Sequence, residues 1–187
     1  MKKLFLMLCA SLLLALSCIT ETKAQCEFAQ GSLGLNFGFG CGNSRYTKDA
    51  HHWHNDFFVP TFNFALDYAI LGNIINNHGS ISAGGYFSMG KGSKKYNGVK
   101  FSDGRWRVGT RGALHYTWVN NLDTYAGVTI GFRNDKCKWD GYDGDTEPGL
   151  DLEAFAGARY KFGNFAIFSE VATTDFAYFQ IGVSLVF

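Results

Sequence analysis

The sequence ends in FAYFQIGVSLVF (residues 176–187), in which apolar side chains alternate with small or polar ones up to the final aromatic. Counted back from the end, the apolar positions are Phe187, Leu185, Val183, Ile181, Phe179 and Ala177. A period of two residues predicts a β-strand with one apolar face, because successive side chains of a strand point to opposite sides. Domains that fold in water usually fray into small polar residues at the terminus. The rest of the chain must therefore explain why this segment ends on an apolar strand.

The same alternation occurs in seven further segments, each bounded by Gly, Asn, Asp or Pro. The eight predicted strands cover residues 31–40, 57–71, 79–90, 105–119, 123–133, 149–162, 164–173 and 176–187. No segment of comparable length shows the 3.6-residue period of a helix. Aromatic residues make up 17% of the chain, and it has 23 glycines and only two prolines. This composition is typical of strands, so we predict an all-β fold.

The first 24 residues have the pattern of a secretory signal peptide. Lys2 and Lys3 precede an apolar run over residues 4–16, which is too short to span a membrane, and the small residues Thr22 and Ala24 precede a cleavage site. We expect residues 1–24 to be removed, which leaves residues 25–187 as a single domain. The stretch LALSC (residues 14–18) allows an alternative in which Cys18 is the lipidated first residue of a lipoprotein. Both interpretations predict export.

The charge of the predicted mature chain is close to zero. The signal peptide contains three of the 17 basic and one of the 16 acidic residues, which leaves 14 and 15. This balance gives no reason to expect a nucleic-acid partner. Residues 25–187 contain no run of 18 consecutive apolar residues, so we predict no transmembrane helix.

The face opposite the apolar one is polar in every strand, and this allows two inverse architectures. A soluble calyx barrel turns its apolar face inward, whereas a membrane barrel turns it to lipid. Trp106 and Trp118 share the apolar parity of one strand and lie twelve residues apart. At about 3.3 Å per residue and a tilt near 40°, they are separated by roughly 30 Å along the barrel axis. That spacing suits two aromatic girdles at the membrane surfaces, so we predict an eight-stranded antiparallel up-and-down transmembrane β-barrel.

The connections between the predicted strands alternate in length. Long ones cover residues 41–56, 91–104 and 134–148, and short ones lie between them. Outer-membrane barrels alternate long outer loops with tight periplasmic turns and keep both termini in the periplasm. We therefore expect three long extracellular loops.

On these residues the mature chain resembles the small eight-stranded outer-membrane β-barrel proteins of Gram-negative bacteria, over residues 31–187. In that family the last strand commonly ends in Phe with apolar residues at alternate positions, which the barrel-assembly machinery reads as a signal. Phe179, Ile181, Val183, Leu185 and Phe187 match this pattern. The resemblance implies a monomer in the outer membrane, in contact with its lipid and lipopolysaccharide. It implies little about biochemical role, because members include adhesion or resistance proteins, membrane anchors, narrow channels and lipid A enzymes.

The inward face carries acidic and basic residues together. We predict a lumen charge network of nine of them: Asp67, Arg107, Arg111, Arg133, Asp151, Glu153, Arg159, Lys161 and Glu170. An eight-stranded barrel is about narrow enough for side chains to fill it, and buried charges are tolerated only when paired. The main interpretation is an ion-paired plug. The alternatives are a gated or water-permeable path, or a catalytic carboxylate pair.

Two outer segments resemble metal sites, but neither has the full pattern. His51, His52 and His54 in HHWH could bind zinc or copper, yet no H-E-x-x-H helix surrounds them. The acidic stretch DGYDGDTE (residues 140–147) lacks the spacing of a calcium loop. We therefore predict no metal and no cofactor. Of the three cysteines that follow the signal, Cys41 and Cys137 would pair if any disulfide formed, because both lie on the outer side while Cys26 is periplasmic.

The sequence favours a non-enzymatic role. We predict a structural or surface-interaction protein that acts through its extracellular loops. A porin-like narrow channel for small or hydrophobic solutes is one alternative, and a lipid A-modifying enzyme is another. A lipid A hydrolase would need catalytic groups that face lipid, whereas the only strand histidine, His115, points inward by parity.

Overall fold

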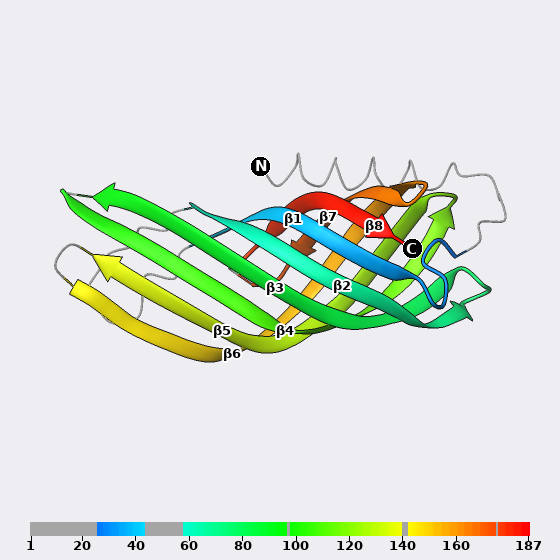
Figure 1. Cartoon of the computed structure of the whole chain (residues 1–187), viewed down its shortest axis with the longest axis horizontal. Coiled ribbons are helices and arrows are strands. Elements are labelled where there is room, and N and C mark those ends of the chain that lie inside the picture. Colours follow the sequence, from blue (N-terminus) through cyan, green and yellow to red (C-terminus); the bar gives the residue numbers. More distant parts are fainter. Residues whose placement is uncertain (1–25, 44–57, 97, 140–141, 175) are drawn as a thin grey trace, which may run out of the picture.

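The computed structural model describes residues 26–43, 58–96, 98–139, 142–174 and 176–187. These residues form eight antiparallel strands, which close into a barrel in the order of the sequence (Figure 1). The strands are β1 (Leu33–Asn43), β2 (Phe58–Ile74), β3 (Gly79–Tyr96), β4 (Val99–Val119), β5 (Leu122–Trp139), β6 (Tyr142–Phe162), β7 (Phe165–Ala172) and β8 (Phe179–Val186). The ring closes where β8 pairs with β1, from Gly34 opposite Val186 to Cys41 opposite Phe179. The predicted fold class is thus confirmed.

The two ends of the barrel differ. At one end, called here the terminus end, the backbone N–H of Leu33 donates to Phe187 at 2.9 Å, and tight turns join β2 to β3, β4 to β5 and β6 to β7. Asn121 and Gly163 occupy two of these turns with φ of 68° and 69°, which short turns commonly require. The opposite end is called here the hairpin end, because β3–β4 and β5–β6 continue there far past β1, β7 and β8 (Figure 1).

The prediction of three long outer loops is wrong for two of them. Residues 91–96 pair with residues 99–104, and β4 pairs with β5 as far as Phe101 opposite Trp139. The β5–β6 ladder likewise continues to Trp139 opposite Tyr142. The alternating pattern stops here because no apolar face is needed, but the backbone can still form a ladder with polar side chains. The first long connection, residues 44–57, lies outside the described residues.

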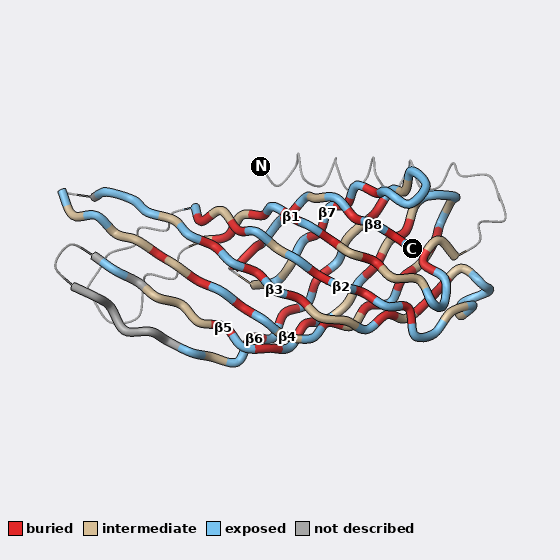
Figure 2. Tube along the Cα trace, viewed as in Figure 1, coloured by how far each residue is buried: buried red, intermediate tan, exposed pale blue. Residues whose placement is uncertain are grey.

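The polarity of the barrel is inverted relative to a protein that folds around an apolar core. Leu150, Leu152 and Phe132 are 69%, 68% and 66% exposed, whereas Asp67 and Arg159 are 1% exposed. Figure 2 shows buried and exposed residues alternating along the strands. No helix in the described part of the chain is long and apolar enough to cross a membrane. The predicted apolar parity is therefore outward, and the charges lie in the lumen.

The aromatic and C-terminal residues singled out in the sequence lie on this outer face. Trp106 and Trp118 are both exposed, and the indole N–H of Trp118 donates to Thr124 Oγ1 at 2.8 Å. The predicted assembly pattern consists of four exposed residues of β8 and the last residue of the chain: Phe179, Ile181, Val183, Leu185 and Phe187. Their roles as girdle and assembly signal stay predictions.

The last strand starts later than the sequence pattern predicts. Residues 176–178 are not part of β8, and the predicted parity is wrong there: Ala177 is buried, while Tyr178 is exposed. The physical reason is that these residues form the connection from β7. In this connection Phe176 turns into the lumen and is fully buried beneath two arginines.

The ring is narrow enough that some inward positions have no room for a side chain. A Cβ added at Gly84 in β3 would lie 1.7 Å from the carbonyl oxygen of Leu66 in β2. By contrast, a Cβ at Gly104 in the outer part of β4 would meet no atom within 4 Å.

We expect Gly84→Ala to destabilise the barrel by roughly 1–3 kcal/mol or more, because the added methyl group collides with the backbone of the neighbouring strand. The measurement is the urea midpoint of refolding into detergent micelles, followed by the gel shift between unboiled and boiled samples. Gly104→Ala is the matched control and should leave the midpoint unchanged. Equal midpoints for the two variants would contradict this account of the strand spacing.

Candidate functional site: the lumen and its two closures

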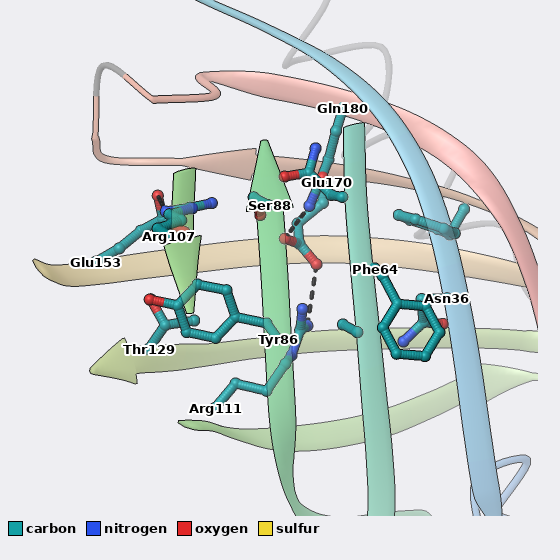
Figure 3. A pocket seen from close by; sticks show the side chains of 13 residues that line it. Asn36, Phe64, Tyr86, Ser88, Arg107, Arg111, Thr129, Glu153, Glu170 and Gln180 are labelled. Atoms are coloured by element: carbon teal, nitrogen blue, oxygen red, sulfur yellow. Dashed lines mark hydrogen bonds and ion pairs between the residues drawn. The ribbon is translucent and has the colours of Figure 1, made fainter. Parts of the chain in front are cut away.

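The middle of the lumen is organised around Arg111. Its Nε lies 3.0 Å from Asp67 Oδ1, and its Nη2 lies 3.1 Å from Glu170 Oε2. The guanidinium also lies 4.1 Å from the centre of the Phe155 ring. Gln180 donates to the other oxygen of Glu170, as Figure 3 shows. One buried cation therefore pairs with two buried carboxylates that come from different strands.

A second group of ion pairs lies toward the hairpin end. Arg107 Nη1 is 2.6 Å from Glu153 Oε2 and 3.3 Å from Asp151 Oδ2. The hydroxyl of Tyr86 donates to the same Asp151 oxygen at 3.3 Å. Arg133 pairs with Asp135 on its own strand and lies 3.9 Å from Asp151 Oδ1. These pairs join β3, β4, β5 and β6 across the lumen.

Toward the terminus end the pairing is looser around Arg159. Its side chain is 1% exposed, and it lies 3.9 Å from both Asp67 Oδ2 and Asp123 Oδ2. None of its three side-chain nitrogens has a hydrogen-bond partner in the structure. The rings of Phe28 and Tyr125 lie 5.0 and 5.4 Å from the guanidinium. Cation–π contacts of this kind offset part of the desolvation of a buried arginine.

Next to Arg159 the structure brings together a serine, a histidine and an aspartate. Ser82 Oγ is 2.9 Å from His115 Nε2, and His115 Nδ1 is 2.9 Å from Asp123 Oδ2. This order of groups is that of a catalytic triad. However, each of the three residues is at most 1% exposed, and the ring of Phe28 stacks on the imidazole with centroids 4.5 Å apart. No reacting group can reach the Ser82 hydroxyl in this arrangement, so the three residues serve as buried hydrogen-bond partners.

The terminus end is closed by residues that precede β1. Phe28 is fully buried and packs against Ala69 and Val186. Its neighbour Glu27 accepts from Lys161 Nζ at the rim, with Oε2 at 3.1 Å. The prediction placed Lys161 in the strand charge network, but its acidic partner comes from outside the strands.

The hairpin end is closed in a similar way by the β7–β8 connection. Phe176 is fully buried, and the guanidinium carbons of Arg105 and Arg107 lie 4.8 and 4.6 Å from its ring centre. Arg105 also donates to the carbonyl oxygens of Phe176 at 3.1 Å and Asn43 at 2.7 Å. Thr174 donates to Glu153, which links the connection to the ion pairs below.

Between these layers lies a small polar cavity of about 20 Å³. Figure 3 shows Tyr86, Arg107, Glu153 and Glu170 among the side chains that line it. A cavity of this size holds roughly one water molecule.

Eight of the nine residues of the predicted lumen charge network are buried in the barrel, and the ninth, Lys161, is partly exposed at the rim. The sequence pattern predicted which face of its strand each of these residues occupies. The same parity rule could have placed Ser82 and Asp123 on the inward face together with His115. Phe28 was missed because it lies outside every predicted strand. Arg105 was missed although it shares the inward parity of Arg107, and Phe176 was not singled out in the predicted last strand.

The described part of the chain does not include the side chains of the two outer segments that were considered as metal sites. His51, His52 and His54 lie outside the described residues, as do the side chains of residues 140–147. Within the described ranges, no group of three or more His, Cys, Asp or Glu side chains could hold a metal ion. Cys41 is a free cysteine, with its Sγ 3.7 Å from the carbonyl oxygen of Phe179, so the considered Cys41–Cys137 disulfide is not formed.

Comparison with known proteins identifies the architecture. No family model matches the sequence, and no curated protein matches it. Among solved structures, the chain is similar to the attachment invasion locus protein Ail of Yersinia pestis, with 14% identity and a TM-score of 0.53 over 84% of this chain and 95% of that one. Neisserial surface protein A gives 13% identity and a TM-score of 0.50 over 85% and 99%. The chain thus has the fold of small eight-stranded outer-membrane β-barrel proteins.

We expect Arg111→Met to cost about 3–5 kcal/mol of unfolding free energy, because it leaves the carboxylates of Asp67 and Glu170 buried without their cation. Urea unfolding in micelles, followed by tryptophan fluorescence, measures this loss. Adding Asp67→Asn and Glu170→Gln to the same variant removes both bare charges and should restore part of the loss. A single variant as stable as the wild type would show that the pairs contribute little.

Proposed function

We propose that the protein is a non-enzymatic outer-membrane β-barrel with a closed lumen, which acts by contact at its hairpin end. The observation that carries this proposal is the inverted polarity of the whole ring. Large apolar side chains cover the outside, and charged side chains fill the inside. A closed barrel with this polarity satisfies every ladder hydrogen bond in lipid and has no free edge there.

The two ends then face different compartments. The terminus end, with its tight turns, faces the periplasm, as in barrels of this class, and the hairpin end faces the outside. The apolar outer face contacts membrane lipid, and lipopolysaccharide is its expected neighbour on the outer side. The exposed aromatic and aliphatic residues at the C-terminus support recognition by the barrel-assembly machinery. A monomer is sufficient, because the ring closes within one chain.

The packing of the lumen favours a structural barrel over a channel. The ion pairs around Arg107 and Arg111 cross the lumen, and the described cavity holds roughly one water. Phe28 and Phe176 close the two ends. A conducting path would need several of these contacts to break together.

The position of His115 favours a role without catalysis at lipid. A lipid A-modifying enzyme needs its nucleophile or base on the membrane face. His115 is 1% exposed and points into the lumen, where Ser82 and Asp123 occupy both of its ring nitrogens.

The outer parts of β3–β6 offer the surface for contact. Residues 91–104 contain four lysines, Lys91, Lys94, Lys95 and Lys100, against one aspartate. Residues 134–148 contain five acidic residues against two lysines. The two hairpins are joined through the β4–β5 ladder, so the segment rich in lysine lies beside the segment that is rich in acidic residues. Such a surface suits recognition of a charged partner more than catalysis.

We expect the expressed protein to be in the outer-membrane fraction and to migrate differently on a gel when the sample is not boiled. The reason is that a folded membrane barrel keeps its shape in detergent until it is heated. Fractionation followed by paired boiled and unboiled lanes measures both properties. A periplasmic protein without a gel shift would contradict the proposed placement.

We also expect the reconstituted protein to show no conductance in planar bilayers. The reason is that Phe28, the ion pairs in the middle of the lumen and Phe176 each close the path. Single-channel recording at low protein density measures this, with a known porin as the control for insertion. Reproducible conductance steps from protein that shows the folded gel shift would support the channel alternative instead.

A further inference from the structure

The terminus end of the lumen holds Glu27 and Phe28 through contacts that resemble the recognition of a ligand. These two residues precede β1 and take no part in any strand ladder. The groups that hold them belong to the strands and turns of the ring. Six residues form what is called here the mouth site: Ser80, His115, Thr117, Asn121, Arg159 and Lys161.

Glu27 is bound at both its backbone and its carboxylate. Its backbone N–H donates to Thr117 Oγ1 at 2.9 Å. The backbone N–H of Asn121 donates to Oε1 at 2.9 Å, and Lys161 Nζ donates to Oε2 at 3.1 Å and to the Glu27 carbonyl oxygen at 2.8 Å. A lysine and a turn amide on one carboxylate select an acidic side chain.

Phe28 is bound by its backbone and its ring. Its carbonyl oxygen accepts from Ser80 Oγ at 2.5 Å. The ring lies between the imidazole of His115, 4.5 Å away, and the guanidinium of Arg159, 5.0 Å away. A Cβ on Gly34 would come within 3.2 Å of this ring, so the first strand leaves space for it. The fully buried pocket therefore selects a flat aromatic group.

The occupant is joined to the barrel by a short turn. Gly31, with φ of 88°, donates its N–H to the carbonyl oxygen of Ala69 at 2.9 Å and starts the path into β1. The six residues of the mouth site lie on β3, β4, β6 and the β4–β5 turn, and they are held by the ring itself. The site can therefore persist when the segment that precedes Gly31 leaves it.

We propose that the mouth site is a binding site for an acidic–aromatic dipeptide unit, which Glu27–Phe28 of the same chain occupies and a free peptide of the same chemistry can replace. That such a peptide arrives from the periplasm rests on the proposed membrane placement. The binding itself rests only on the fold, so it is tested in detergent micelles. Failure of binding would leave the proposed function intact, and failure of fractionation would leave the binding result intact.

The test uses the full chain carrying Glu27→Ala and Phe28→Ala, which removes the acidic and the aromatic side chain from the site, and the peptide N-acetyl-Glu-Phe-amide. Isothermal titration should show one peptide bound per chain in this double variant. In the wild type the apparent affinity should be at least about tenfold weaker, because a tethered occupant competes at an effective concentration in the millimolar range. Both proteins are first checked for the folded gel shift.

Specificity is tested with a changed peptide and a changed site. N-acetyl-Lys-Phe-amide should bind at least about tenfold more weakly, because its cation faces Lys161. Adding Lys161→Met to the double variant should weaken N-acetyl-Glu-Phe-amide by a similar factor, whereas adding Lys94→Met, on the outer hairpin, should have no effect. A folded double variant that binds neither peptide, or binds both equally, would overturn the proposal.

A second measurement covers the case in which the double variant does not fold. Glutamyl endopeptidase cleaves after Glu27 only when the segment has left the mouth. Lys161→Met in the otherwise unchanged chain should speed this cleavage at least about tenfold, and millimolar N-acetyl-Glu-Phe-amide should speed it in the wild type. A cleavage rate that neither change affects would show that the segment is a fixed part of the barrel.

Discussion

The structure depends on the narrowness of a ring of eight strands. Such a ring leaves space for little more than one layer of side chains across its lumen, so each inward charge must find its partner within that layer. The apolar outer face, which we propose lies in lipid, leaves no place for a charge that turned outward. Arg111 between Asp67 and Glu170, and Arg107 between Asp151 and Glu153, are the result. The pairs come from distant strands, so they also fix which parts of the ring face one another.

Much of this arrangement could be predicted from the sequence, because a side chain in a barrel strand can face only inward or outward. Arg107 and Glu153 were assigned to the lumen by counting, and both are buried there. Their pairing could not be predicted, since it depends on the register and tilt of strands that are far apart in sequence. The ends of β3–β6 were also missed, because a polar ladder above the rim shows no alternation of apolar and polar residues.

The two closures show a second limit of sequence patterns. Phe28 and Phe176 both lie outside the strands, and each enters a mouth of the barrel beneath an arginine. A single aromatic residue in a connecting segment has no period that would mark it. What makes it suitable is an arginine that lies over the ring. Arg105 over Phe176 also donates to backbone carbonyl oxygens, whereas Arg159 over Phe28 has only ion pairs at 3.9 Å. The same solution serves both ends, although the segments that provide the rings are unrelated in sequence.

Because β3–β6 continue to pair beyond the rim, their sheet extends well past the shorter strands of the ring. Residues 91–96 of β3 continue past its last pairing with β2 at Gly90, and at about 3.3 Å each they carry the sheet roughly 20 Å further. A hydrogen-bonded sheet of this length is stiff, unlike an irregular loop. Lys91, Lys94, Lys95 and Lys100 are therefore held at fixed distances from one another and from the rim. An approaching molecule would meet the field of these charges before it touched the barrel, and could be turned by it before contact.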